Sequence, residues 1–117
     1  MAAGRLTTHV LDLSRGQPGA GMAYRLYRAS GGQRTLLTQG RTNRDGRTDT
    51  PLLAGEAFTT GLYELEFDAA AYFRSIGETI ASIWTTIPIR FEVTDASGHY
   101  HVPLLIAPGG YSTYRGS

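Results

Sequence analysis

Residues 87–93 (IPIRFEV) show the pattern that decides the fold class. Apolar side chains alternate there with proline, arginine and glutamate, and residues 63–67 (YELEF) repeat the alternation. A period of two places the apolar side chains on one face, which is typical of a half-buried β-strand. This pattern predicts an all-β protein.

Further strands are expected on both sides of these two. The turn signals are residues 30–32 (SGG), Asp45-Gly46 and residues 108–110 (PGG). The expected strands are residues 6–13, 24–28, 34–40, 100–106 and 111–115. Several short strands separated by frequent turns predict a β-sandwich.

One segment has a helical period instead. Apolar residues at positions 69, 72, 73 and 76 follow the i, i+3, i+4, i+7 spacing of a helix face. Asp68 can cap the start and Gly77 can end it. We therefore expect one short helix that covers an end of the sandwich. Ile83 and Trp84 lie in the next apolar stretch and are expected to continue that packing.

Length and composition limit the class of protein. A chain of 117 residues corresponds to one domain, residues 1–117. Hydrophobic residues make up 41% and charged residues 18%, which is a globular composition. The net charge of +1 gives no electrostatic signature for nucleic acid or an anionic membrane. No apolar run approaches the ~20 residues of a membrane span. Residues 1–13 have no signal-peptide core, so we expect a cytoplasmic protein.

The residue types that are missing exclude some chemistry. The chain has no cysteine, which excludes disulfides, thiolate zinc sites and thiol nucleophiles. All 11 basic residues are arginine, so no lysine can form a Schiff base. The sequence contains neither a G-x-S-x-G elbow nor a glycine-rich phosphate loop.

The three histidines are the first candidates for chemistry. His99 and His101 are two residues apart, so both point to one face of an extended strand, opposite the apolar face. Together with His9 they could form a three-histidine metal site. The spacing alone favours ordinary surface histidines over the metal site, and non-metal acid–base groups are the third alternative.

Arginines and the C-terminus supply further candidates. Arg41, Arg44 and Arg47 cluster around the Asp45-Gly46 turn, either as a solvated loop or as guanidinium donors for a planar, carbonyl-rich ligand. Residues 111–117 (YSTYRGS) carry two tyrosines and an arginine, unlike a free polar tail. We therefore expect this tail to be held against the domain.

Four motifs resemble those of the 5-hydroxyisourate hydrolases, the transthyretin-related proteins. They are residues 6–12 (LTTHVLD), 40–47 (GRTNRDGR), 99–105 (HYHVPLL) and 114–117 (YRGS). Their order and spacing agree with the family over the whole chain, and four motifs in register are specific where one alone would be weak.

The resemblance implies a fold, an assembly and a reaction. The fold would be transthyretin-like: two four-stranded antiparallel sheets with one short helix. The assembly would be a homotetramer, a dimer of dimers, with active sites at the dimer–dimer interface. The reaction would be ring opening of 5-hydroxyisourate to 2-oxo-4-hydroxy-4-carboxy-5-ureidoimidazoline in urate catabolism. The family uses no metal and no cofactor.

The resemblance also implies the site residues. The catalytic residues would be His9, Arg47 and His101. The substrate-binding residues would be His9, Arg47, Tyr114, Ser117 and, as a weaker match, Ser112. His99 would be a neighbour of His101, and which histidine acts as the base stays open. The alternative function is a small-ligand carrier on the same fold, without turnover. Transthyretin, the carrier, lacks the terminal tetrapeptide and the histidine set that this chain retains.

Overall fold

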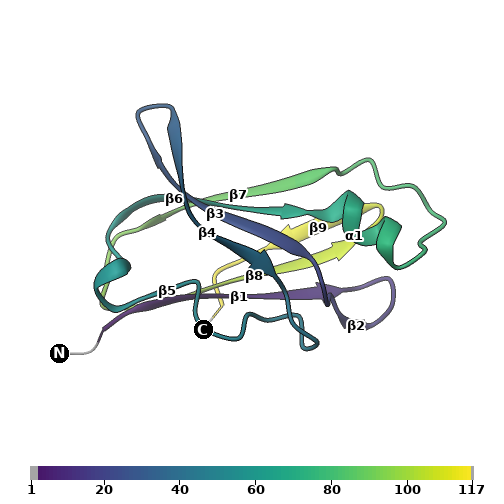
Figure 1. Cartoon of the computed structure of the whole chain (residues 1–117), viewed down its shortest axis with the longest axis horizontal. Coiled ribbons are helices and arrows are strands. Elements are labelled where there is room, and N and C mark those ends of the chain that lie inside the picture. The colour runs from purple at the N-terminus through teal and green to yellow at the C-terminus, as the bar shows by residue number, and fades with distance from the viewer. Residues whose placement is uncertain (1–2, 117) are drawn as a thin grey trace.

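The protein consists of two β-sheets packed face to face (Figure 1). The computed structural model describes residues 3–116. One sheet, here the β1–β8 sheet, has the strand order β2 (Gln17–Pro18), β1 (Arg5–Asp12), β8 (His99–Ala107) and β9 (Gly110–Thr113), with β5 (Leu53–Ala54) also paired to β1. The other, here the β3–β6 sheet, has the order β4 (Gln33–Arg41), β3 (Ala23–Ser30), β6 (Gly61–Asp68) and β7 (Thr86–Val93). The expected β-sandwich is confirmed.

The β1–β8 sheet differs from the expectation in two ways. It contains a fifth, two-residue strand, and β1 and β8 run parallel, with Thr7 opposite His101 and His9 opposite Pro103. The family resemblance implies two four-stranded antiparallel sheets. β1 and β8 are far apart in sequence, so no tight turn dictates their relative direction.

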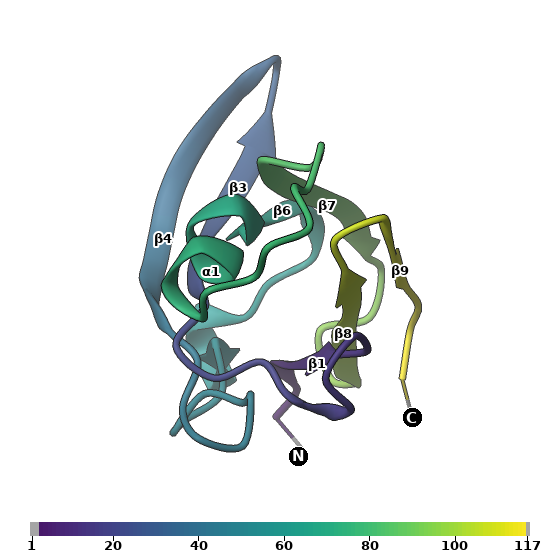
Figure 2. The ribbon, with the colours of Figure 1, turned by 90° about the vertical axis from the view of Figure 1, so that its right-hand side faces the viewer.

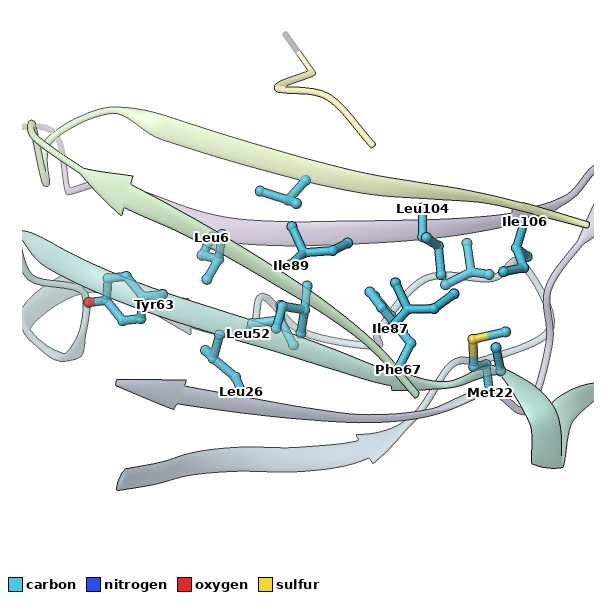
Figure 3. Close-up of a cluster of buried hydrophobic side chains, with 14 of the residues drawn as sticks. Leu6, Met22, Leu26, Leu52, Tyr63, Phe67, Ile87, Ile89, Leu104 and Ile106 are labelled. Atoms are coloured by element: carbon cyan, nitrogen blue, oxygen red, sulfur yellow. The ribbon is translucent and has the colours of Figure 1, made fainter. Parts of the chain in front are cut away.

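The core fills the space between the two sheets (Figure 3). Leu6 and Val10 of β1 and Leu104 of β8 are fully buried, as are Leu65 and Phe67 of the opposite sheet. Alternate residues of each strand point inward, as the period of two requires. The intervening residues of β1 and β8, including the histidines, therefore lie on the outer face of their sheet.

The predicted helix is present as α1 (Ala69–Ser75) and covers one end of the sandwich (Figure 2). The Asp68 carboxylate caps it by accepting a hydrogen bond from the Ala71 N–H at 3.2 Å. Tyr72 is buried, and its hydroxyl donates to Oδ2 of the buried Asp12 at 2.6 Å, which joins the helix to the end of β1. The helix prediction and its cap are confirmed.

The segment after the helix is only partly as expected. Trp84 packs against the core. Its ring lies edge-on to the ring of Tyr111, with 5.4 Å between the ring centroids. The side chain of Ile83 is 78% exposed, so its predicted packing is wrong. Ile83 lies at a bend of the chain, and of the two side chains only that of Trp84 packs on the core.

The C-terminal tail is held against the domain, as predicted. β9 pairs with β8, and beyond it the Gly116 N–H donates to the His101 carbonyl at 2.7 Å. The strand ends at Thr113, before the predicted limit at residue 115. Within residues 3–116, no helix is long and apolar enough to cross a membrane.

Candidate active site

The outer face of the β1–β8 pair brings three histidines together. Parallel register sets Thr7 beside His101 and His9 beside Pro103, while His99 lies opposite Arg5. Paired residues of neighbouring strands share a face. His9 and His101 are half-buried there, and His99 is exposed. The predicted outward direction of His99 and His101 is confirmed.

A tight turn carries Arg47 to this face. The Asn43 side-chain oxygen accepts hydrogen bonds from the N–H groups of Asp45, at 2.9 Å, and Arg47, at 3.1 Å. The Gly46 carbonyl accepts from the Val10 N–H at 2.7 Å, so the turn is fastened to β1. The backbone of Arg47 then pairs with the backbone of His9 in an isolated antiparallel β-bridge.

Gly46 is needed at this point of the turn. Its φ of +74° lies in the left-handed region that side chains rarely adopt. A Cβ on Gly46 would also collide with the backbone carbonyl oxygen of Val10. The close approach of the turn to β1, and with it the position of Arg47, therefore depends on glycine.

The hydrogen bond of His9 fixes which ring nitrogen carries its proton. Nε2 lies 2.9 Å from the carbonyl oxygen of Asp45, and a carbonyl only accepts. Nε2 therefore donates, and neutral His9 keeps its lone pair on Nδ1. Burial, together with the nearby Arg47 guanidinium, lowers the pKa of His9 below 6.5. Near pH 7 the ring is thus a neutral acceptor beside a cation.

His101 has a different set of contacts. Its Nδ1 lies 2.8 Å from the Thr7 hydroxyl, which is also 2.9 Å from Nε2 of His99. Burial lowers the pKa of His101 below 6.5, and the charges of Arg47, His99 and His9 lower it further. Among the described residues, no hydrogen bond involves Nε2 of His101, so this nitrogen remains for a ligand or water.

An open cavity of about 410 Å³ lies against these groups. Its lining includes Arg5, Thr7, Arg47, Asp49, His99 and His101. His9 is not among the lining residues, but its backbone pairs with that of Arg47, which is. The cavity is rich in hydrogen-bond donors and cations, which suits a small, carbonyl-rich or anionic ligand.

The remaining predicted residues lie elsewhere. Tyr114 is 56% exposed and lines a second cavity of about 300 Å³ between β7 and the tail. Ser112 of β9 pairs with Leu105 of β8. It therefore shares the outer face of the sheet with His101 but lies further along that face. Ser117 lies outside the described residues. The single chain thus brings His9, Arg47 and His101 together but does not bring Tyr114 to them.

Sequence reasoning missed two residues of the site. Thr7 precedes His9 by two positions, so strand alternation alone places it on the same face as His9. Asn43 lies four residues before Arg47, and asparagine at the start of a turn is a known signal for side-chain to backbone bonding. Arg41 and Arg44 are exposed and line no part of the 410 Å³ cavity.

A three-histidine metal site is one of the alternatives that the sequence allows. Across residues 3–116, no group of three or more His, Cys, Asp or Glu side chains is placed to hold a metal ion. The Thr7 hydroxyl lies between His99 and His101, and the His9 ring is turned to the Asp45 carbonyl.

The family model that matches this chain is the HIUase/Transthyretin family, over residues 6–116. The chain belongs to the HIUase/Transthyretin family. The expected resemblance and the transthyretin-like fold are therefore confirmed.

Relatives within this family agree along their whole length. The 5-hydroxyisourate hydrolase 2 of Rhizobium meliloti (strain 1021) is 53% identical over 116 residues, covering 97% of both chains. A solved 5-hydroxyisourate hydrolase of Klebsiella pneumoniae is 36% identical with a TM-score of 0.81, covering 97% of this chain and 94% of its own.

A larger protein contains a similar fold. The crystal structure of an (S)-allantoin synthase matches 99% of this chain with a TM-score of 0.93 and 43% identity. This chain spans 44% of that synthase.

Proposed function

We propose that this protein is a 5-hydroxyisourate hydrolase, which opens the ring of 5-hydroxyisourate by hydrolysis. The observation that carries the proposal is the placement of Arg47 beside His9 and His101 on one sheet face, against a 410 Å³ cavity. The HIUase/Transthyretin family match and the relatives named 5-hydroxyisourate hydrolase support the same activity.

Hydrolysis of a cyclic ureide needs three functions. Water must be deprotonated, the oxyanion that develops must be stabilised, and the leaving nitrogen must receive a proton. We assign the first and third to His101, which lines the cavity, is half-buried and has no hydrogen bond at Nε2 among the described residues. A neutral histidine is a suitable base near pH 7.

Arg47 would stabilise the oxyanion. Its guanidinium offers several N–H donors in a planar fork, a geometry that matches carbonyl and oxyanion groups. Its charge also lowers the pKa of His101 after the larger effect of burial, which keeps the base unprotonated.

His9 would orient the substrate. Its Nε2–H is committed to the Asp45 carbonyl, which leaves Nδ1 as an acceptor next to Arg47. A ureide ring carries N–H donors that such an acceptor can bind. His9 and Arg47 together would then distinguish the N–H edge of the substrate from its carbonyl edge.

The assembly is part of the proposal. We infer a homotetramer, a dimer of dimers, whose interface encloses the cavity and brings Tyr114, Ser112 and Ser117 into substrate binding. The position of the cavity on the outer face of the β1–β8 sheet supports this arrangement. Light scattering coupled to size exclusion would give a mass near four chains, and a monomeric mass with full activity would contradict it.

The cytoplasmic location, the single-domain organisation and the independence from metals and cofactors stay predictions. Fractionation of the producing cells checks the location. Turnover in the presence of EDTA checks the metal.

The experiment for the function is absorbance decay of 5-hydroxyisourate generated in place by urate oxidase. Since the substrate also decays spontaneously, the rate without protein is the control. Acceleration that is proportional to protein concentration and survives EDTA is expected. Stoichiometric binding without acceleration would instead favour the carrier alternative.

A further inference from the structure

Thr7 places one hydroxyl hydrogen between two histidine rings. Its Oγ1 lies 2.9 Å from Nε2 of His99 and 2.8 Å from Nδ1 of His101. A hydroxyl has one hydrogen to donate and can accept at the same time. When the hydroxyl donates to one ring, the other ring must donate to the hydroxyl, so the proton position on His101 is coupled to that of His99.

Two arrangements of these protons couple the two rings through Thr7. In the first, His101 carries its proton on Nδ1 and donates to Thr7, which donates to Nε2 of His99. Nε2 of His101 is then a free lone pair, as a base requires. In the second, Nε2 of His99 donates to Thr7, which donates to Nδ1 of His101. Nε2 of neutral His101 then carries the proton, as an acid requires.

We propose that Thr7 and His99 form a proton relay behind His101, which switches His101 between its base and acid tautomers. The inference rests on the proposed function, in which Nε2 of His101 deprotonates water. As the Nε2–H bond of His101 forms, its Nδ1–H bond breaks and that proton moves to Thr7 Oγ1. The hydroxyl proton of Thr7 moves to Nε2 of His99. The net change is one proton lost from water and one gained by His99.

The return step reverses each transfer. The Nε2–H bond of His101 breaks as its proton moves to the leaving nitrogen of the substrate. Nδ1 of His101 takes the Thr7 hydroxyl proton, and Thr7 takes the proton from Nε2 of His99. No oxidant, reductant or co-reactant is needed, and all three residues end as they began.

The surroundings of His101 explain why a relay is useful. An imidazolium at His101 would be half-buried near the guanidinium of Arg47 and the ring of His9. The other charged groups around the cavity are Arg5 and Asp49, and Arg115 of the tail approaches the His99 carbonyl at 3.4 Å. The relay moves the positive charge to His99, which is exposed and can be solvated.

The tail keeps the His101 ring in the orientation that the relay needs. A Cβ built on Gly116 would lie 2.5 Å from Cδ2 of His101, so the tail packs closely along that ring edge. The Gly116 N–H also holds the His101 carbonyl at 2.7 Å. Thr7 at Nδ1 and the tail at Cδ2 therefore hold the ring of His101, which lines the 410 Å³ cavity.

Four variants test the relay in the full-length protein. Thr7→Val removes the hydroxyl with little change of shape, and Thr7→Ser keeps it. His99→Gln keeps a polar group near the Nε2 position but cannot take up a proton. Thr35→Val makes the same Thr-to-Val change at an exposed position of β4, outside the site.

The relay predicts a specific pattern in the kinetics. Thr7→Val and His99→Gln each lower kcat about 10-fold or more, as for a weakened acid–base step, with KM little changed. Thr7→Ser, which restores the hydroxyl, recovers most of the kcat that Thr7→Val loses, and Thr35→Val stays near wild type. The Thr7→Val/His99→Gln double variant loses no more than either single variant, because both interrupt one path. Unchanged kcat in Thr7→Val, or additive losses in the double variant, would overturn the relay.

A readout without turnover separates the relay from the function. In protein labelled with ¹⁵N-histidine, the Nδ1 and Nε2 shifts of His101 report its tautomer. His99→Gln is expected to move the His101 shifts in the wild-type background but not in the Thr7→Val background. An identical response in both proteins would overturn the relay. A wild-type protein that shows this coupling but no hydrolysis would reject the proposed function and leave the proton path intact.

Discussion

The outer faces of the two sheets both carry charged side chains, but they use them differently. On the β3–β6 sheet, Glu64 is buried and paired with Arg34 at 2.6 Å and Arg90 at 3.1 Å. Glu66 pairs with Arg34 and Arg25. All the ion pairs found within residues 3–116 lie on this face.

Among residues 3–116, the outer face of the β1–β8 sheet holds cations and histidines without such pairing. Arg47 lies beside His9, and the charge of Arg47 lowers the pKa of both His9 and His101 once burial has acted. Charged side chains that pair with one another contribute to stability. A face with available hydrogen-bond donors and lone pairs can instead bind and react. The comparison identifies the β1–β8 face as the chemical one.

Replacing one arginine on each face is expected to give the largest difference in activity between the two sheets. Arg47→Gln is expected to lower kcat/KM about 10²–10³-fold, the usual loss for an oxyanion-stabilising donor. Arg34→Gln removes the same charge from the other face and should leave kcat/KM near wild type. Steady-state kinetics of both variants checks this, and equal activities would mean that the two faces were assigned wrongly.

Alanine substitutions at two glycines with positive φ distinguish the effect of a displaced turn on activity from the effect of backbone strain on stability. Gly46→Ala has both the unfavourable φ and the collision with Val10, so it should displace Arg47 and lower kcat/KM about 10²-fold. Gly31→Ala has a φ of +57° but open space around it. It should cost about 1 kcal/mol of stability and no activity. Kinetics and urea unfolding of both variants measure the difference, and full activity in Gly46→Ala would contradict the proposed role of the turn.

The pH dependence of activity follows from the lowered pKa values. Since burial and then Arg47 lower the pKa of His9 and His101 below 6.5, both rings are neutral at pH 7. kcat/KM should be flat near pH 7 and fall only at a pH below 6.5, about tenfold per unit for one essential base. A pH–rate profile from 8 to 5, with thermal melts at each pH, checks this. An acid limb above pH 6.5 would contradict the described environment of the rings.

On the other face, pH should act on stability. Although burial opposes ionisation, hydrogen bonds from Arg34 and Arg90 hold the pKa of Glu64 below 4.5. The folded pKa is below the unfolded one, so this contribution is present above pH 4.5 and lost as pH falls through the folded value.

Glu64→Gln is the smallest change that we expect to measure. Both arginine partners are largely exposed, so the loss should be only about 1–2 kcal/mol at pH 7, with kcat/KM unchanged. Urea unfolding at pH 7 and pH 3 provides the test. The difference between wild type and variant should shrink at pH 3, and an undiminished difference would contradict the pairing.

The sequence predicted what depends on local pattern. Alternation in residues 87–93 and 63–67 indicated the strands, and Asp68 indicated the helix cap. Residue spacing also put His99 and His101 on the outer face. These features are set by neighbours within a few residues of each other.

What the sequence did not predict depends on long-range pairing. The parallel register of β1 and β8 puts Thr7 between His99 and His101, which are more than ninety positions away (92 and 94). The burial of Glu64 likewise requires arginines from two other strands. The second cavity beside Tyr114 depends on how the tail meets β7. No local period encodes such contacts.

The most direct test of the account is kcat/KM of His101→Asn for 5-hydroxyisourate. Asparagine keeps a polar group near the Nδ1 position, which preserves a contact with Thr7, and removes Nε2. The account predicts a fall of about 10²-fold or more with an unchanged melting temperature. Activity within a few-fold of wild type would show that Nε2 of His101 is not the base, and would contradict the central claim.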